Sequence, residues 1–310
     1  MNPPSNSDAY SPAVTEIIAI RAQKSAREKI LRGLLVGGVL TWFGVLILFP
    51  IYGIVTEALK NGLSVFFSSL TTPEALHAFW LTALTTIVAV VINTFLGVIM
   101  AIVFSRQDFK GKLFMESLLD LPFAISPVVA GFMFVVLFGP NGWIGKLFES
   151  ANIKIVYALP GMMIATVFVT LPFTAREIIP ILREFGRDEE EAAATLGASP
   201  WKTFRSVTLP SIKWGLAYGI TLTIARSIGE FGAVMVVSGS IINHTQTATL
   251  FIHAQYTDFN YAGAFAAALV LAILSFVILI FIQLFYKKKE AERANAQTGT
   301  DTIEDIGELS

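Results

Sequence analysis

Residues 78–105 read AFWLTALTTIVAVVINTFLGVIMAIVFS, a run of 28 residues without an ionisable side chain. An α-helix rises about 1.5 Å per residue, so about 20 apolar residues cross the roughly 30 Å of hydrocarbon in a bilayer. The run is therefore long enough to span a membrane as one helix. It is also continuously apolar, whereas the strands of a membrane β-barrel alternate over about 10 residues. We expect an all-α membrane protein.

Five further stretches repeat this pattern along the chain. Four of them carry no charge, and the fifth, 214–237, is interrupted by Arg226 and Glu230. The uncharged stretches are 33–56, 121–145, 155–175 and 259–286. By contrast, 238–257 holds too many Asn, Gln, Thr and His side chains for hydrocarbon. The sequence therefore predicts a polytopic protein with six transmembrane helices.

The composition agrees with this fold class and excludes several others. Hydrophobic residues make up 54% of the 310-residue chain and charged residues only 15%, against about 25% in soluble domains. A disordered chain and a collagen-like chain are therefore excluded. The chain has no Cys, which rules out a disulfide scaffold, thiolate catalysis and thiolate zinc sites. The three histidines, His77, His244 and His253, are spread along the sequence, so we expect no metal site.

The basic residues indicate which side of the membrane each loop occupies. With six spans, 18 of the 22 Lys and Arg fall on one side, three on the other, and Arg226 lies within a span. The positive-inside rule places the basic side, with both termini, in the cytoplasm. We expect a bacterial plasma membrane, which is the inner membrane of a Gram-negative cell. The predicted domains are a cytoplasmic tail (1–32), a six-helix membrane domain (33–286) and a second cytoplasmic tail (287–310).

The two cytoplasmic tails differ in their content of apolar residues. Residues 14–32 mix Ile and Leu with basic residues, which suits a helix lying along the cytoplasmic interface. A solvated tail that simply follows the positive-inside rule explains the same residues. Beyond Glu290 the chain has few apolar residues, and we expect disorder there.

The longest cytoplasmic connection, 180–211, lies between spans four and five. Residues 188–210 read DEEEAAATLGASPWKTFRSVTLP. Four acidic residues before an Ala run favour a helix N-terminus, Gly197 favours its end, and Pro200 favours the start of a second short helix over 201–207. Two short amphipathic helices hinged at a glycine are suited to docking in a groove of another protein. A solvated hairpin that only connects two spans is the alternative.

The spacing in this loop resembles the EAA signature of the permease subunits of ABC transporters, the binding-protein-dependent transport permeases. The matching residues are Glu191-Ala192-Ala193, Gly197 and Leu209-Pro210, with Val207 where the family usually has Ile. In that family the loop forms a coupling helix in a cleft of the ATPase subunit. The resemblance implies a type I ABC-importer permease architecture with docking through Glu191, Ala192 and Gly197. The full set of candidate coupling residues is Glu191, Ala192, Ala193, Gly197, Pro200, Leu209 and Pro210.

The resemblance to this family extends from about residue 73 to residue 286. Four stretches within this range indicate which substrate the family member transports. Residues 120–131 (DLPFAISPVVAG), 139–143 (GPNGW), 169–173 (VTLPF) and 225–234 (ARSIGEFGAV) are similar to the permeases of sulfate/thiosulfate importers. Molybdate permeases share the Gly-Glu-Phe-Gly core and the EAA loop. The resemblance therefore implies sulfate or thiosulfate import, with molybdate or tungstate as the alternative substrate.

Several residues at membrane depth are candidates for the transport pathway. Pro122 and Pro127 break the helix hydrogen-bond pattern in span three, which is tolerated against protein or a water-filled cavity. Packing kinks are the alternative reading. Arg226 and Glu230 are spaced i, i+4, so they can pair on one helix face. One hypothesis is that Arg226 meets a dianion in the pathway while Glu230 holds the arginine in place. The other is that the pair is a salt bridge that only locks span five to a neighbouring helix. The complete set of pathway candidates is Pro122, Pro127, Arg226, Gly229, Glu230 and Gly232.

Small residues also recur at the spacing of close helix contacts. They are Gly33 and Gly37 in span one, and Gly215 and Gly219 in span five. Glycines four residues apart allow two helix backbones to approach closely. Both pairs therefore permit close contact with a neighbouring helix.

The expected partners follow from the family resemblance. They are two copies of a cytoplasmic ATPase, a second homologous sulfate permease, an external sulfate/thiosulfate-binding protein and membrane lipid, with no nucleic acid. The chain has no G-x-x-x-x-G-K-[S/T] motif, so ATP and Mg are expected in the ATPase, and no cofactor is expected here. A self-sufficient secondary transporter is the main rival, although it would normally show more buried ionisable residues and internal repeats. A membrane enzyme is disfavoured, because the chain lacks clustered catalytic groups.

Overall fold

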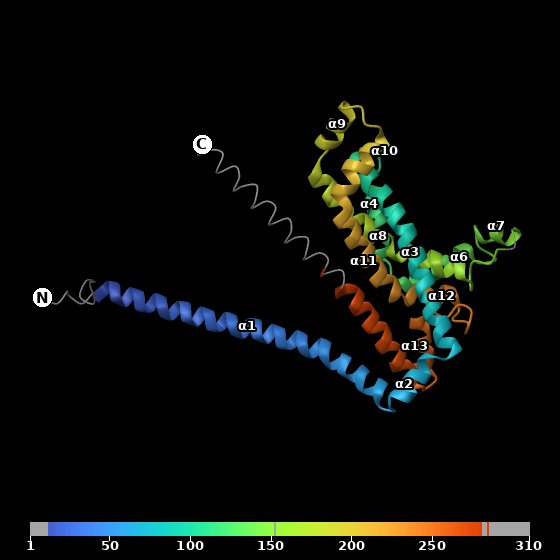
Figure 1. Cartoon of the computed structure of the whole chain (residues 1–310), viewed down its shortest axis with the longest axis horizontal. Coiled ribbons are helices and arrows are strands. Elements are labelled where there is room, and N and C mark those ends of the chain that lie inside the picture. Colours follow the sequence, from blue (N-terminus) through green and yellow to red (C-terminus); the bar gives the residue numbers. More distant parts are fainter. Residues whose placement is uncertain (1–11, 152, 281–283, 285–310) are drawn as a thin grey trace. The chain divides into compact units, whose positions relative to one another are not determined.

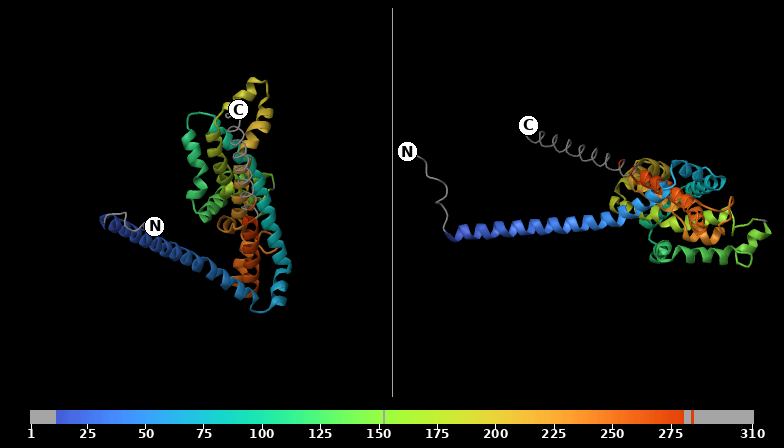
Figure 2. Two further views of the ribbon diagram at one scale, coloured as in Figure 1. Left: turned by 60° about the vertical axis from the view of Figure 1, so that its left-hand side comes forward. Right: turned by 90° about the horizontal axis from the view of Figure 1, so that it is seen from below.

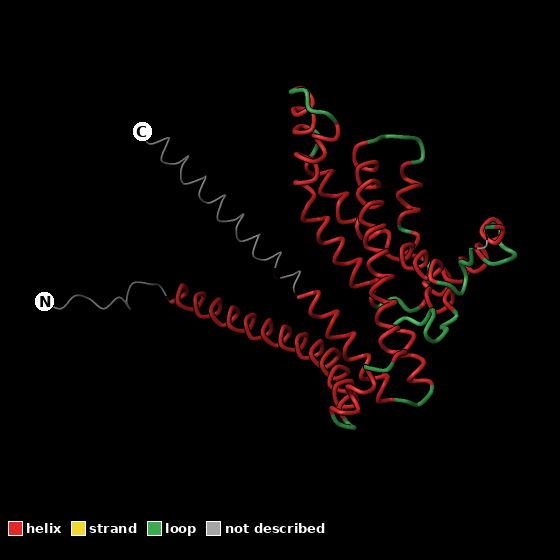
Figure 3. Tube along the Cα trace, turned by 45° about the vertical axis from the view of Figure 1, so that its right-hand side comes forward, coloured by secondary structure: helices red, strands yellow, loops and turns green. Residues whose placement is uncertain are grey.

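The computed structural model describes residues 12–151, 153–280 and 284, and within this part of the chain every regular element is a helix (Figure 3). The first helices are α1 (Pro12–Leu59), α2 (Leu63–Leu70), α3 (Pro73–Arg106), α4 (Lys112–Leu119), α5 (Leu121–Ala124), α6 (Pro127–Phe138) and α7 (Gly145–Ser150). They are followed by α8 (Leu159–Phe185), α9 (Asp188–Thr195), α10 (Pro200–Thr203), a π-helical turn (Phe204–Thr208), α11 (Leu209–Ile228), α12 (Gly232–Ser238) and α13 (Ala248–Thr257). A last helix covers Tyr261–Ile280. The predicted all-α class is confirmed.

Four helices in the described part of the chain are long and apolar enough to cross a membrane. They are Leu31–Leu59 within α1, then α3, α8 and Tyr261–Ile280. A bent pair, Pro200–Ile228 and Gly232–Ser238, makes a fifth span if its two arms are counted together. The region 238–257 contributes only the ten-residue helix α13 to the described structure. The predicted count of six continuous spans is therefore not reproduced.

The stretch predicted as span three, 121–145, is broken into short helices. Ser126 has extended backbone angles (φ −57°, ψ 134°), as residues before proline usually do. Pro127 then opens α6, which has 12 residues and is therefore about 18 Å long. The apolar segment and the break at Pro127 were both expected from the sequence, but the segment is not one continuous membrane-spanning helix.

The chain divides into two compact units, residues 1–56 and 57–310. The first unit consists of most of α1, whose apolar residues from Leu31 onward are largely exposed within the chain. Nothing lies within 4 Å of a Cβ added at Gly33 or Gly37, so the close contact that this pair permits is not seen there. The helix expected over 14–32 is part of α1, whereas its interfacial placement stays a prediction. The predicted C-terminal tail, 287–310, lies outside the described residues.

The second unit is built around α3, α8 and α11, which run side by side (Figure 1). Thr174 of α8 is buried where the three helices meet. A Cβ added at Gly97 of α3 would lie 2.8 Å from the Cβ of Thr174, and one added at Gly219 of α11 would lie 2.7 Å from its Cα. A Cβ at Gly215 would come 2.8 Å from the carbonyl oxygen of Glu177. The close contact that Gly215 and Gly219 permit is therefore present.

A buried side-chain hydrogen bond also joins α3 to α8. The fully buried Asn93 donates through Nδ2 to Oγ1 of Thr170 at 2.7 Å and to the carbonyl oxygen of Val167 at 3.1 Å. Such bonds between membrane helices contribute on average about 0.6 kcal/mol each. Close packing and this bond together make α3 and α8 a stable base for the elements at either end.

Candidate functional site

The loop between α8 and α11 forms the helix–turn–helix that the sequence predicts. Its first helix, α9, carries Asp188, Glu189, Glu190 and Glu191 in its first turn. Gly197 follows with φ +82°, and the amide of Ala198 bonds the carbonyl of Ala193 at 3.0 Å, which closes the helix end. Glycine adopts this left-handed conformation without the steric cost that a side chain would bring. Gly197 is therefore the hinge between the two arms.

The second arm differs from the separate short helix expected over 201–207. The side chain of Ser199 accepts a hydrogen bond from the amide of Lys202 at 3.4 Å, and Pro200 opens α10. The chain then passes through the π-helical turn directly into α11, which Leu209 begins. This arm is thus a continuation of span five, so a displacement of α10 is carried into α11 without an intervening loop.

The loop projects from one end of the bundle, and α13 lies at the opposite end (Figures 1 and 2). Glu191, Ala192 and Gly197 are exposed, while Ala193 is partly buried. Leu196 is 88% exposed and Trp201 is 69% exposed, and the Trp201 ring stacks on Phe204 with centroids 5.5 Å apart. Exposed large apolar side chains among charged residues are typical of a protein-binding surface. Leu196 was not among the candidate coupling residues, although it lies within the same loop.

An inward-facing carboxylate in the same helix was missed entirely. Glu190 contacts Arg106 at the end of α3, with Arg106 Nε 2.9 Å from Oε2 and Nη2 donating to Oε1 at 3.1 Å. Thr208 Oγ1 also donates to Oε1 of Glu190 at 2.7 Å. The acidic run therefore has two faces: Glu190 is directed toward its own chain, while Glu191 faces outward.

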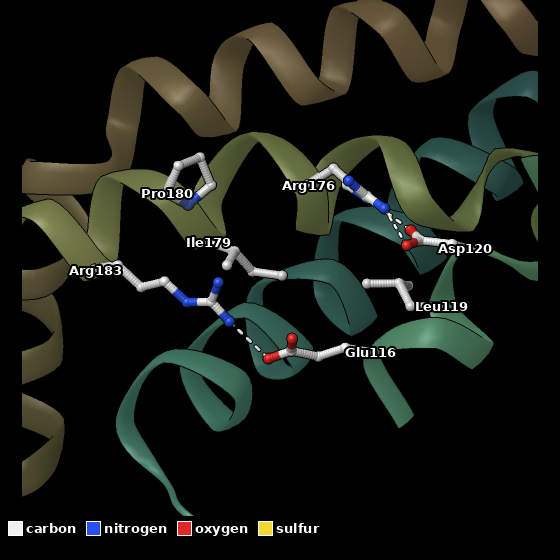
Figure 4. A pocket seen from close by; sticks show the side chains of 7 residues that line it. All are labelled: Glu116, Leu119, Asp120, Arg176, Ile179, Pro180 and Arg183. Atoms are coloured by element: carbon white, nitrogen blue, oxygen red, sulfur yellow. Dashed lines mark hydrogen bonds and ion pairs between the residues drawn. The ribbon is translucent and has the colours of Figure 1, made fainter. Parts of the chain in front are cut away.

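Two more ion pairs line a hollow of about 490 Å³ between α4 and α8 (Figure 4). Arg183 Nη2 donates to Oε1 of Glu116 at 2.6 Å, and Arg176 Nε donates to Oδ1 of Asp120 at 2.6 Å. Leu119 is buried beside them and packs with Ile179. In the preceding turn, the Lys112 ammonium holds the pKa of Asp108 below its ordinary value of 3.8. Each arginine of the hollow has a carboxylate beside it, so the hollow is close to neutral.

At membrane depth, α11 ends at Ile228 and α12 starts at Gly232, with an angle of 54° between the two arms. Glu230 lies in the break and is 3% exposed. Its Oε1 accepts the amide of Ala233 at 3.0 Å, and its carbonyl oxygen accepts Thr249 Oγ1 at 2.7 Å. The predicted pairing with Arg226 is present, with Arg226 Nη1 2.5 Å from Oε2. Glu230 thus connects both arms of the bent span to the first turn of α13.

The broken spans three and five meet at their breaks. A Cβ added at Gly232, the first residue of α12, would lie 3.0 Å from Cβ of Pro127, the first residue of α6. One added at Gly131 would lie 2.9 Å from the carbonyl oxygen of Ala233. These contacts cover the first residues of α6 and α12, whereas Ser126 and Gly229, which lie in the breaks, are exposed within the chain.

Not every pathway candidate belongs to this group. Gly229 is an exposed residue at the end of α11. Pro122 is buried at the start of α5, where the ring of the next residue, Phe123, packs edge-on against Phe173 at 5.1 Å. In the described part of the chain, no group of three or more His, Asp and Glu side chains could hold a metal ion.

Membrane-length helices, two broken spans in contact and an exposed loop at one end define a multi-pass membrane protein of the transport class. The family of binding-protein-dependent transport system inner membrane components matches residues 93–290, and the chain belongs to this family. As a member it is a permease component of a transport system and not an enzyme.

Individual relatives agree with this assignment. The chain is 46% identical to the sulfate transport system permease protein CysW of Synechococcus elongatus, over 88% of this chain and 94% of that protein. It is 40% identical to CysW of Escherichia coli K12, over 81% of this chain and 87% of that protein. It is 34% identical to the sulfate transport system permease protein CysT of the same strain, over 77% and 86% of the two chains.

The fold matches solved importers as well. The chain is similar to a chain in the crystal structure of a bacterial ABC transporter that imports the acidic polysaccharide alginate, with a TM-score of 0.73. The match covers 86% of this chain and 99% of the other at 16% sequence identity. The type I importer permease fold expected from the sequence is therefore confirmed, while the number of continuous helices differs from the six predicted.

Proposed function

We propose that this chain is a permease subunit of an ABC importer for sulfate and thiosulfate, lining half of the translocation pathway. The observation that carries the proposal is the identity of 40–46% to proteins named sulfate transport system permease CysW, over more than four fifths of this chain. The more distant CysT permeases, at 33–36% identity, suggest the identity of the second subunit. The working assembly then holds this chain, a CysT-like permease and two ATPase subunits that bind ATP and Mg.

The α9–α10 loop is the surface that meets the ATPase. The exposed Glu191, Leu196 and Trp201 supply a charge and two apolar side chains to a cleft of the partner. Gly197 sets the angle between the arms, and α10 continues into α11, so closure of the ATPase dimer moves span five directly. With the ATPase at this loop, we expect the loop and both termini in the cytoplasm, and the α13 end outside, facing the sulfate-binding protein.

The bent part of span five belongs to the pathway wall. Glu230 is enclosed, and its carboxylate accepts the Ala233 amide after the break and pairs with Arg226 before it, whereas Arg226 keeps 32% of its side chain exposed. A carboxylate directly beside an anion route would repel a dianion. The pair therefore acts first to hold the bend, and Arg226 is the group of the two that is open to the pathway.

Uptake assays test the substrate. The chain is expressed with its ATPase, second permease and binding protein in a strain lacking the native sulfate permeases, and uptake of labelled sulfate is measured. We expect uptake that unlabelled sulfate or thiosulfate abolishes and that equimolar molybdate leaves largely unchanged. Uptake of labelled molybdate that sulfate does not inhibit would identify a molybdate permease instead.

A further inference from the structure

The carboxylate of Glu190 lies at a point where four segments of the chain meet. Arg106, the last residue of α3, holds it through two nitrogens, and Thr208 of the π-helical turn donates to Oε1. Arg106 Nη1 also donates to the carbonyl oxygen of Leu182, near the end of α8, at 2.9 Å. We call this set, Arg106, Glu190, Thr208 and the Leu182 carbonyl, the Arg106–Glu190 node. It joins the ends of α3 and α8 to α9 and to the base of α11.

The node is enclosed, unlike the other charged residues of α9. The side chains of Arg106 and Glu190 are 13% and 19% exposed, whereas Asp188, Glu189 and Glu191 are exposed. The hydrogen bond from Arg106 Nη2 to the carboxylate is charge-assisted and therefore stronger than a neutral hydrogen bond. Removing one partner would leave the other charge buried and poorly compensated. The contact therefore fixes the position of α9.

The rest of α9 offers little else to hold it. The helix has no buried residue of its own. It is flanked by Gly186 at φ +71° and Gly197 at φ +82°, and a Cβ added at either would meet nothing within 4 Å. Both ends are thus open glycine hinges. Without the node, the partner could rotate α9 about these hinges without moving the membrane helices.

Thr208 connects Glu190 to span five. It is 5% exposed and ends the π-helical turn that joins α10 to α11. Single π-helical turns within α-helices are frequent at functional sites, because they shift the side chains that follow. Here the turn ends on the hydroxyl that reaches Glu190. The node thus fastens the loop to span two through Arg106 and to span five through Thr208.

We propose that Arg106, Glu190 and Thr208 are positioning residues that transmit displacement of the α9–α10 loop to span two together with span five. Glu191, Leu196 and Trp201 meet the ATPase, whereas Glu190 passes the movement to the chain's own helices. The proposal rests on the proposed function, because it assigns these residues a part in ATP-driven transport.

The test measures coupling separately from docking. Wild type, Glu190→Gln and the control Glu189→Gln are purified with the ATPase, second permease and binding protein, and reconstituted in vesicles. Co-purified ATPase, ATP hydrolysis and sulfate uptake are then measured on each preparation. We expect Glu190→Gln to retain its ATPase while sulfate imported per ATP hydrolysed falls at least about fivefold, the lower end of typical coupling between sites. Glu189→Gln, exposed on the same helix, should match wild type.

A second pair of variants keeps the proposal testable if Glu190→Gln does not assemble. Thr208→Ser keeps the donor hydroxyl and should remain coupled, whereas the similarly shaped Thr208→Val should lose coupling in the same direction as Glu190→Gln. Three results would each overturn the proposal. They are wild-type coupling in Glu190→Gln, loss of the ATPase from that variant, and equal coupling in the two Thr208 variants. Failure of wild type to bind the ATPase or import sulfate would instead refute the proposed function.

Discussion

The Oε1 atom of Glu230 accepts the backbone amide of Ala233 at 3.0 Å, across the bend where α11 gives way to α12. A single buried side chain thereby satisfies a free amide at the start of α12 and, through Oε2, faces the guanidinium of Arg226. The sequence left open whether this pair serves the anion or the structure. Its bonds to the backbone show that Glu230 has a structural part at the bend.

Two substitutions at this position should therefore differ. Glu230→Gln keeps an oxygen for the Ala233 amide and loses the charge opposite Arg226, so it should destabilise the protein less than a variant that loses both. Glu230→Ala removes the cap, and loss of a helix cap typically costs about 0.5–2 kcal/mol. Thermal unfolding of the purified complex, with sulfate uptake measured on the same preparation, compares the two. Equal stability of Ala, Gln and wild type would show that the cap contributes nothing.

The contact between α6 and α12 makes a second prediction. A Cβ at Gly131 would approach Cβ of Val236 to 2.8 Å and the carbonyl oxygen of Ala233 to 2.9 Å. Gly131→Ala should destabilise the protein by about 1–3 kcal/mol, as overpacking usually does, and should reduce uptake. The matched control is Gly44→Ala in α1, where nothing lies within 4 Å of the added Cβ. A similar melting temperature for both variants would contradict the close contact.

The ion pairs of the α4–α8 hollow predict that exchanging the charges of both partners restores the function that a single charge reversal lowers. Arg183→Glu places two carboxylates together opposite α4 and should loosen α4 from α8, whereas adding Glu116→Arg restores the opposite charges. Both side chains are partly exposed, so the pair should contribute at most about 1 kcal/mol. Uptake is measured for both single variants and the double variant at low and high salt. Rescue that is absent at every salt concentration would show that the pair does not hold α4.

Gly197 gives a prediction about backbone conformation. Its φ of +82° is costly for most residues, and β-branched residues are least tolerant, whereas Asn adopts the left-handed region more readily. A Cβ there would meet nothing within the chain, so any defect comes from strain or from the partner. Gly197→Val should lose the co-purifying ATPase, while Gly197→Asn should keep most of it. Comparable loss in both would indicate that the partner requires glycine for space.

Local patterns predicted local structure well. The acidic run, Gly197 and Pro200 marked the ends of α9 and α10, because capping and turn preferences depend on neighbouring residues. The Gly215 and Gly219 spacing marked a helix contact for the same reason. The polar segment 238–257 was correctly left out of the spans: its helix α13 has only ten residues, and Thr245 hydrogen-bonds the backbone of the turn before it.

The features that were missed depend on distant residues. Arg106 and Glu190 are 84 positions apart, and nothing in an acidic run of four shows which carboxylate will face inward. The prolines indicated a break in span three, whereas the break in span five was not anticipated. The two broken spans meet where Gly232 packs against Pro127, and such mutual packing is not visible in either segment alone.

The central claim is that this chain moves sulfate only when an ATPase acts on its α9–α10 loop. The most direct measurement is uptake of labelled sulfate into vesicles that contain the purified complex and enclose ATP and Mg, with the binding protein outside. The account predicts uptake that requires ATP, the ATPase subunits and the binding protein, and that falls to background with Gly197→Val. Sulfate uptake by this chain without the ATPase, driven by an ion gradient, would contradict it.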